Sequence, residues 1–222
     1  MKKIILFATI LVIISCSHFN NISEPYRNTV IENKSLAISQ FDIKLDVDES
    51  YLKFFQNGDV KKNVIDYVMF TFNDNFMNTS TFKTVEIVDI DKSDFENRSY
   101  KAKDEFEMLT PINGSTVKSN STYDFVMIIQ DFEIHSKEGS SSSGVYSGGS
   151  WSGGGNFPPT INAKFKYLIW DNNNKQIVLF GESSSIAAIT SEDESPWFEL
   201  VSKASRKTIK KTPFDKYPNM MY

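Results

Sequence analysis

The chain has 222 residues, of which 40% are hydrophobic, and its 24 Lys and Arg against 28 Asp and Glu give a net charge of −4. This length is enough for one domain with a sizeable core, since a chain of about 150 residues already buries about 68–70% of its unfolded surface. The mildly acidic balance argues against nucleic acid as a partner, because nucleic-acid binding relies on clustered Lys and Arg. A single cysteine, Cys16, leaves no disulfide framework within the chain.

The N-terminus has the pattern of an export signal. Two lysines precede eleven apolar or neutral residues, 4–14, and roughly 20 residues would be needed to span a bilayer. The stretch Ile13-Ile14-Ser15-Cys16 resembles a bacterial lipobox, which implies a signal peptide over 1–15 and a lipid on Cys16. Two or more acyl chains would anchor the protein stably to a membrane. The alternative is an ordinary signal peptide with a stray cysteine.

Composition sets the expected domain boundaries. Residues 16–35 are polar and lack periodicity, so we expect the lipidated cysteine to be followed by a flexible tether. Residues 36–212 are predicted to form a single globular α/β domain, with a flexible Gly/Ser-rich hairpin loop over 139–157. Residues 213–222 are expected to be a loosely ordered tail.

Hydrophobic periodicity predicts the elements of that domain. Alternation from Phe41 to Val47 indicates a strand, and an i+4 repeat from Val60 to Phe76, capped by Asp59, indicates a helix. We also expect strands over 84–90, 123–134, 161–169 and 176–189, a short helix over 100–109, and a last helix with Ser195 as its N-cap. This order predicts an α/β (α+β) fold, a two-layer sandwich in which two main helices cover one face of a mixed, mostly antiparallel sheet of about five strands.

The stretch GSSSSGVYSGGSWSGGG, residues 139–155, allows three interpretations. A domain linker is disfavoured, because the part after it is too small for a comfortable core of its own. A phosphate-binding loop is disfavoured by the missing G-x-x-x-x-G-K-[ST] spacing. We therefore predict a long hairpin loop on which Tyr146 and Trp151 are candidate contacts to a partner protein, a glycan or the lipid interface. The alternative is a solvated loop without a function of its own.

The last helix carries five cations towards its end: Lys203, Arg206, Lys207, Lys210 and Lys211. Favourable interaction with the helix dipole accounts for most of them. A basic patch that touches anionic lipid or peptidoglycan is the alternative, because five charges exceed what a helix end needs.

Catalytic motifs are missing from the sequence. The two histidines, His18 and His135, do not form a cluster of the kind that metal sites and triads require, so no metal and no cofactor is predicted. None of the motifs H-E-x-x-H, G-x-S-x-G or S-x-x-K is present. Carboxylates do cluster over 89–91 and 192–194, and such charge runs are usually solvated surface. We therefore predict that the protein is not an enzyme.

The element order, together with YDFVMIIQDFEI and FKYLIWDNNNKQIVLFGES, resembles a group of bacterial envelope lipoproteins. The group includes the curli-secretion channel lipoprotein, the outer-membrane activators of penicillin-binding proteins and the N-terminal domain of the Tol-system β-propeller protein. The resemblance covers most of 35–212 and implies docking or assembly without a shared catalytic motif. Ser17, after the cysteine, resembles an outer-membrane sorting signal.

Together these features predict a lipoprotein anchored in the outer membrane through Cys16 and facing the periplasm. Its expected role is that of a non-enzymatic accessory or binding protein, with an envelope protein or peptidoglycan as its partner. The alternatives are a subunit of a self-assembling export channel and a hydrolase that acts on envelope polymers. Assembly into a homo-oligomer stays open.

Overall fold

The computed structural model describes residues 18–101, 105–112, 114–118, 121–141, 145–147, 150–152 and 156–218. The predicted signal peptide and the predicted lipidation site, Cys16, lie outside the described residues.

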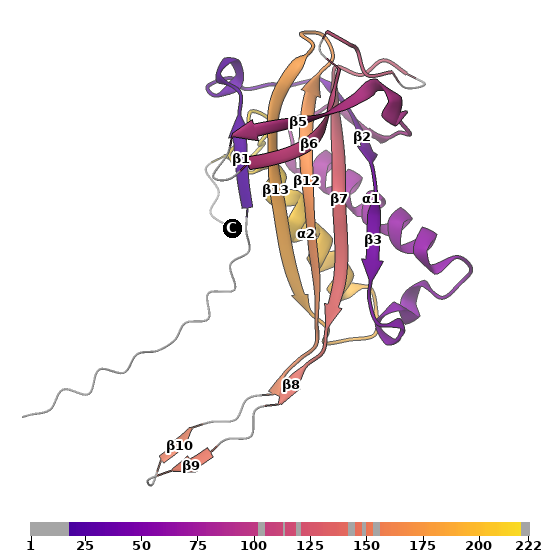
Figure 1. Cartoon of the computed structure of the whole chain (residues 1–222), viewed down its shortest axis with the longest axis vertical. Coiled ribbons are helices and arrows are strands. Elements are labelled where there is room, and N and C mark those ends of the chain that lie inside the picture. The colour runs from indigo at the N-terminus through magenta and orange to yellow at the C-terminus, as the bar shows by residue number, and fades with distance from the viewer. Residues whose placement is uncertain are drawn as a thin grey trace, which may run out of the picture.

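Within the described residues, seven strands form a central sheet in the order β1, β13, β12, β7, β2, β4, with β3 also paired to β7 (Figure 1). Their bounds are β1 His18–Ile22, β2 Ser35–Gln40, β3 Ile43–Asp46, β4 Thr84–Ile87, β7 Phe125–Lys137, β12 Thr160–Asp171 and β13 Gln176–Ala188. Strands β1, β13, β12 and β7 are antiparallel, whereas β2 and β3 run parallel to β7, and β4 runs parallel to β2. The α+β class and the mixed, mostly antiparallel sheet are confirmed, and β1 and β2 account for the strands beyond the expected five.

Helices α1 (Val60–Thr79) and α2 (Ser195–Ile209) cover one face of this sheet, as predicted. On α1 the i+4 residues Val64, Val68, Phe72 and Phe76 are all fully buried. Asp59 caps the helix by accepting a hydrogen bond from the Lys62 amide at 3.1 Å. Ser195 is the first residue of α2 rather than its N-cap, because its amide donates to Asp193 Oδ1 at 2.9 Å.

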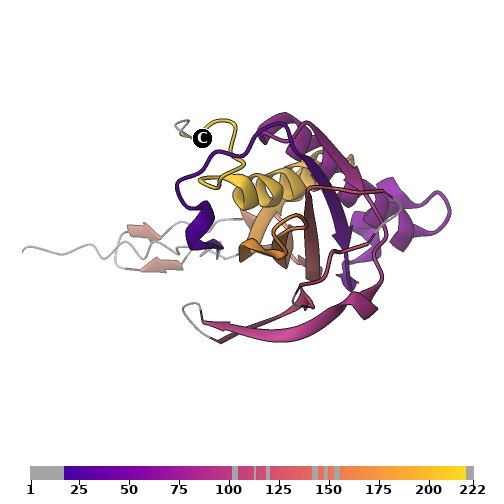
Figure 2. The same cartoon turned by 90° about the horizontal axis from the view of Figure 1, so that it is seen from above.

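A hairpin of β5 (Phe95–Lys101) and β6 (Glu105–Pro111) covers part of the opposite face (Figure 2). The helix predicted over 100–109 is therefore wrong. Burial along β6 alternates, with Phe106, Met108 and Thr110 inside, which is a strand period that fits the second face of the sheet. The hairpin adds a third layer to the expected two.

Both ends of the described chain pack on the domain. Residues 18–22, predicted as tether, pair with β13, and Tyr26 of the short helix η1 (Glu24–Tyr26) is buried. Phe214, predicted in the tail, is 1% exposed and stacks on Phe82 at a centroid distance of 4.6 Å. Both hydrophobic clusters lie between Phe19 and Phe214, so a chain that starts at Ser17 contains all the core residues that the structure describes.

The remaining elements are η2 (Glu49–Phe55), η3 (Lys92–Asp94), β8 (Ser140–Ser141), β9 (Val145–Ser147), β10 (Ser150–Ser152) and β11 (Asn156–Phe157). Strand β8 pairs with β11, and β9 pairs with β10. Figure 1 shows β8, β9 and β10 beyond the lower end of the sheet, displaced to the left of the β7–β12 pair. The Gly/Ser-rich segment thus connects two adjacent strands of one sheet, which fits the predicted hairpin and not a domain linker.

The side chain of Asp124 bonds to residues on two other segments at one end of the sheet. These bonds should make the stability of the protein sensitive to acid. Asp124 Oδ2 accepts hydrogen bonds from the amide and hydroxyl of Ser35, both at 3.0 Å, and its Oδ1 accepts one from Asn173. Burial alone would raise the pKa of Asp124, but these bonds outweigh it and hold the pKa below its usual value. The stabilisation is therefore complete at neutral pH and is lost as the pH falls through the lowered pKa of the folded state.

Asp124→Asn is expected to lower the free energy of unfolding by about 1–2 kcal/mol at neutral pH, and by much less in acid, where both chains carry a neutral group. Urea titrations at several pH values measure this difference. Asp89→Asn, at an exposed carboxylate, is the control and should leave the pH dependence unchanged. An equal loss for Asp124→Asn at every pH would contradict the assignment.

Candidate binding surfaces

The outer part of the β7–β12 hairpin, residues 138–159, is referred to below as the arm. The β9–β10 register pairs Trp151 with Tyr146, so the two candidate contact residues occupy directly opposed backbone positions. A Cβ on Gly139 would lie 2.6 Å from the Phe157 carbonyl oxygen, so only glycine permits this close approach at the base of the arm. The role of Tyr146 and Trp151 in binding a partner stays a prediction.

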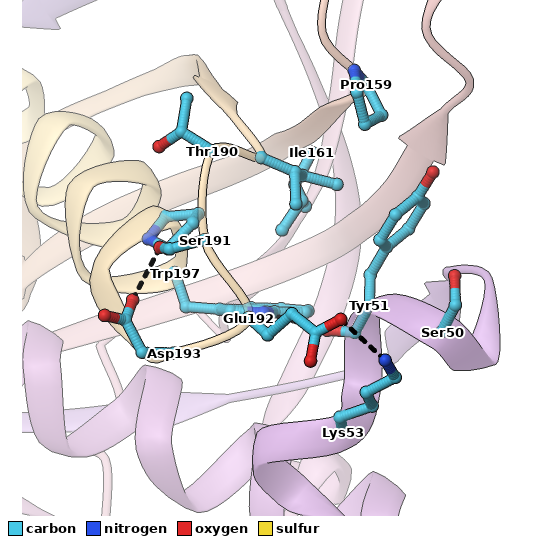
Figure 3. A pocket seen from close by; sticks show the side chains of 12 residues that line it. Ser50, Tyr51, Lys53, Pro159, Ile161, Thr190, Ser191, Glu192, Asp193 and Trp197 are labelled. Carbon is cyan, nitrogen blue, oxygen red and sulfur yellow. Dashed lines mark hydrogen bonds and ion pairs between the residues drawn. The ribbon is translucent and has the colours of Figure 1, made fainter.

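A pocket of about 360 Å³ lies at the base of the arm, between η2, the start of β12 and the loop that leads into α2 (Figure 3). Pro159, Ile161 and Trp197 contribute its apolar surface. Its polar groups bond to one another: Lys53 Nζ lies 2.6 Å from Glu192 Oε1, and the Ser191 hydroxyl donates to Asp193 Oδ1 at 2.7 Å.

The hydrogen bonds of Asp193 give its side chain a structural role in this pocket. Hydrogen bonds from Ser191 and from Ser195 lower the pKa of Asp193, so its carboxylate stays ionised well below neutral pH. A general acid or base works best with a pKa near the working pH, and the shift of Asp193 moves away from that range. Asp193 instead closes the start of α2 and fixes the pocket wall.

The other polar clusters named from the sequence lie in structural positions. Asp91 caps η3 by accepting from the Ser93 amide at 2.9 Å. His135 lies on β7 and pairs in register with Asn162 and Asp46. Across the described part of the chain, no group of three or more His, Cys, Asp or Glu could hold a metal ion. Across the same residues, no helix is long and apolar enough to cross a membrane.

An exposed aromatic hollow, not predicted from the sequence, lies where η2 meets α1. Phe70 is 65% exposed and Phe54 is 44% exposed, and both line the hollow with Tyr67. Phe54 packs edge-to-face on Phe55, at 5.1 Å, and on Tyr67, at 6.0 Å. Phe70 lies off the i+4 stripe of α1. An apolar residue outside the buried stripe of a helix was the one feature of the sequence that could have indicated this exposed surface.

A basic groove of about 440 Å³ runs along the last turns of α2. It is lined by Thr79, Lys203, Arg206, Lys207, Ile209, Lys210, Asp215 and Tyr217. The sequence predicted these cations at the helix end, and the structure places four of them around one hollow.

Comparison with known proteins finds solved structures that cover most of this chain at low sequence identity and low TM-score. No protein-family model matches the chain, and no curated protein matches it. The chain is similar to the PelC dodecamer from Paraburkholderia phytofirmans, with 8% identity, 90% of this chain and 98% of that chain covered, and a TM-score of 0.39. It is also similar to the hypothetical protein CT253 from Chlamydia trachomatis, with 10% identity, 81% and 94% covered, and a TM-score of 0.40.

A putative neuraminyllactose-binding hemagglutinin homolog from Helicobacter pylori is similar at 10% identity, with 82% of this chain and 80% of that chain covered and a TM-score of 0.35. Likenesses at these TM-scores do not define a function. The proposals below therefore rest on the residues and geometry of this protein.

Proposed function

We propose that the protein is a lipid-anchored, non-enzymatic binding protein of the bacterial cell envelope that captures its partner with the arm. The observation that supports this proposal is the ladder of β8–β11 and β9–β10, which continues the β7–β12 hairpin beyond the sheet (Figure 1). In this proposal Cys16 carries the lipid, the outer membrane is the destination, and an envelope protein or peptidoglycan is the partner.

The composition of the arm supports a binding role. Tyr146 and Trp151 are paired in register within a segment that is otherwise almost entirely Gly and Ser. Aromatic rings provide much of the energy at protein interfaces, because each buries a large apolar area at a small cost in side-chain entropy.

Photo-crosslinking in intact cells tests the proposal. A photoreactive amino acid at Trp151 is expected to give a discrete crosslinked species, whereas the same amino acid at Ser93, an exposed position on η3, is expected to give none. Replacing Tyr146 and Trp151 with serine should weaken capture of the crosslinked partner by about 10-fold or more.

Deletion of 140–155 provides the folding control. Gly139 and Phe157 already approach each other closely at the base of the arm, so the shortened chain can close there without moving β7 or β12. We expect an unchanged unfolding transition together with loss of capture. Capture that survives both the deletion and the double serine substitution would refute the role of the arm.

A further inference from the structure

The basic groove of α2 faces away from the core. Lys203, Arg206 and Lys210 are exposed and follow one another at spacings of three and four residues, which places them on one side of the helix. Leu200, Val201 and Ala204 are fully buried against the sheet. The cations therefore form a continuous stripe on the outer surface of the domain.

Little negative charge offsets this stripe. The groove lining has four cations and a single carboxylate, Asp215, whose oxygens accept hydrogen bonds from the backbone amides of Lys211 and Tyr217 at 2.8 and 2.9 Å. Lys203 pairs with Glu199 one turn earlier. Arg206, Lys207 and Lys210 form no ion pair with any residue that the structure describes.

The position of Lys207 links the groove to the N-terminal end of β1. Its Nζ donates to the Ser184 carbonyl oxygen at 2.5 Å, and the neighbouring residue Ser183 pairs in register with His18. Partial burial lowers the pKa of His18, and the nearby positive charge of Lys207 lowers it further. Two residues further along β1, the side-chain amide of Asn20 donates a hydrogen bond to the Lys210 carbonyl oxygen at the end of α2, at 3.4 Å.

This arrangement limits the distance between the groove and the proposed anchor. Cys16 precedes His18 by two residues, which together span at most about 7 Å of extended chain. Because β1 is hydrogen-bonded into the sheet, no long tether separates the domain from an acyl group on Cys16. The leaflet that holds the acyl chains would then lie against the side of the domain that carries α2.

We propose that the basic groove binds the headgroups of anionic phospholipids in the leaflet that holds the anchor, so that the domain lies on the membrane in one orientation. This proposal rests on the proposed acylation of Cys16. A Lys or Arg near an anionic membrane strengthens binding about fivefold, so Arg206, Lys207 and Lys210 together strengthen it by about 100-fold. Tyr217, at the groove edge, supplies an amphipathic ring of the kind favoured at lipid interfaces.

Vesicle sedimentation of the chain from Ser17 to Tyr222 tests the groove without the anchor. We expect binding to vesicles of phosphatidylcholine mixed with phosphatidylglycerol, little binding to phosphatidylcholine alone, and weaker binding at high salt because exposed charges are screened. Combined reversal of Lys203, Arg206 and Lys210 to glutamate should weaken binding by roughly 100-fold or more. Lys207 is left unchanged because its bond to Ser184 supports the helix.

The matched control reverses three exposed lysines outside the groove, Lys61, Lys83 and Lys118, to glutamate. Both triple variants change the net charge equally, so only a localised site distinguishes them. Equal loss in the two variants, or equal binding to neutral and anionic vesicles, would overturn the proposal. Failure to bind vesicles together with retention on peptidoglycan would overturn it in favour of a polymer ligand.

Acylation is measured separately, by mass spectrometry of the full-length protein processed in cells. If Cys16 is acylated but the groove does not bind anionic vesicles, the proposed orientation on the membrane is refuted, whereas the proposal that the protein is a lipoprotein is not. An unmodified Cys16 refutes the anchor, whatever the vesicles show. The two proposals therefore fail on different measurements.

Discussion

Replacing Phe72 with alanine is expected to lower the free energy of unfolding by about 3–5 kcal/mol, which is the usual cost of a large cavity in a tight core. Phe72 is fully buried on the inner face of α1. Its ring meets those of Phe165 and Phe132 of the sheet edge-to-face, at centroid distances of 5.3 and 6.3 Å. Truncation removes these contacts and leaves a hole between helix and sheet that the two strands cannot close, because both are held in the centre of the ladder.

Phe70 provides the matched control, two residues away on the same helix. Its side chain is 65% exposed, so Phe70→Ala should change stability by no more than about 0.5 kcal/mol. Denaturant titration monitored by circular dichroism measures both variants. If Phe72→Ala does not fold, Phe72→Leu should still show a loss of about 1–2 kcal/mol. Equal losses for the alanine substitutions at Phe70 and Phe72 would mean that α1 is rotated about its axis.

The sequence predicted helices and strands most accurately where an element has a clear hydrophobic pattern of its own. The i+4 repeat of α1 and the apolar run of β7 require burial whatever their neighbours are, so both could be located without a structure. The polar turn before Lys175 likewise follows from local residues, since Asp171 accepts hydrogen bonds from the amides of Asn173 and Asn174.

Elements that depend on distant partners were missed. Strand β1 reads HFNNI and has little apolar content, and it is held by pairing with β13, about 160 residues away. The sequence predicts a helix over 100–109 where the β5–β6 hairpin lies. The alternation that places Phe106 and Met108 inside becomes informative only once the second face of the sheet is known. Phe214 is buried against Phe82 and Phe125, which its own neighbours in sequence do not indicate.

The candidate binding surfaces divide in the same way. The arm and the cations of α2 could be named from composition, since Gly, Ser and charged residues keep their character on the surface. The groove formed by Arg206 and Lys210 near the start of β1 could not be predicted, because a free tether was expected there. The aromatic hollow around Phe54 and Phe70 needs the contact between η2 and α1, which no local pattern specifies.

Replacing Gly181 with alanine is expected to detach β1 from the sheet. A Cβ at this position would lie 2.1 Å from the Phe19 carbonyl oxygen and 2.7 Å from the Tyr167 hydroxyl. Gly181 pairs in register with Asn20 on one side and with Tyr167 on the other, so neither neighbouring strand can yield without losing its own ladder. Because β1 is a short edge strand and β12 is central, the strain should be relieved by release of β1.

Hydrogen exchange measures this release directly. The β1 amides that bond to β13 should lose most of their protection in Gly181→Ala, while those of β7 and β12 keep theirs. Gly58→Ala is the matched control. Its added Cβ meets nothing within 4 Å but is strained by a φ of +93°, so it should cost about 1 kcal/mol and leave β1 protected. Unchanged protection of β1 in Gly181→Ala would mean that β1 does not pack on β13 as described.

The same substitution links the fold to the membrane proposal. In the native chain, docked β1 holds residue 18 beside Lys207, so an acyl group on Cys16 would bring the basic groove to the lipid surface. With β1 released, residues 16–22 become a real tether and the groove is free to turn away from the bilayer. The acylated Gly181→Ala protein should therefore stay in the membrane. In this variant Arg206 and Lys210 should lose the protection against chemical labelling that anionic lipid gives them. The acylated Gly58→Ala protein is the control and should keep this protection. Protection that persists after β1 is shown to be released would mean that the groove finds the membrane without the constraint of the docked strand.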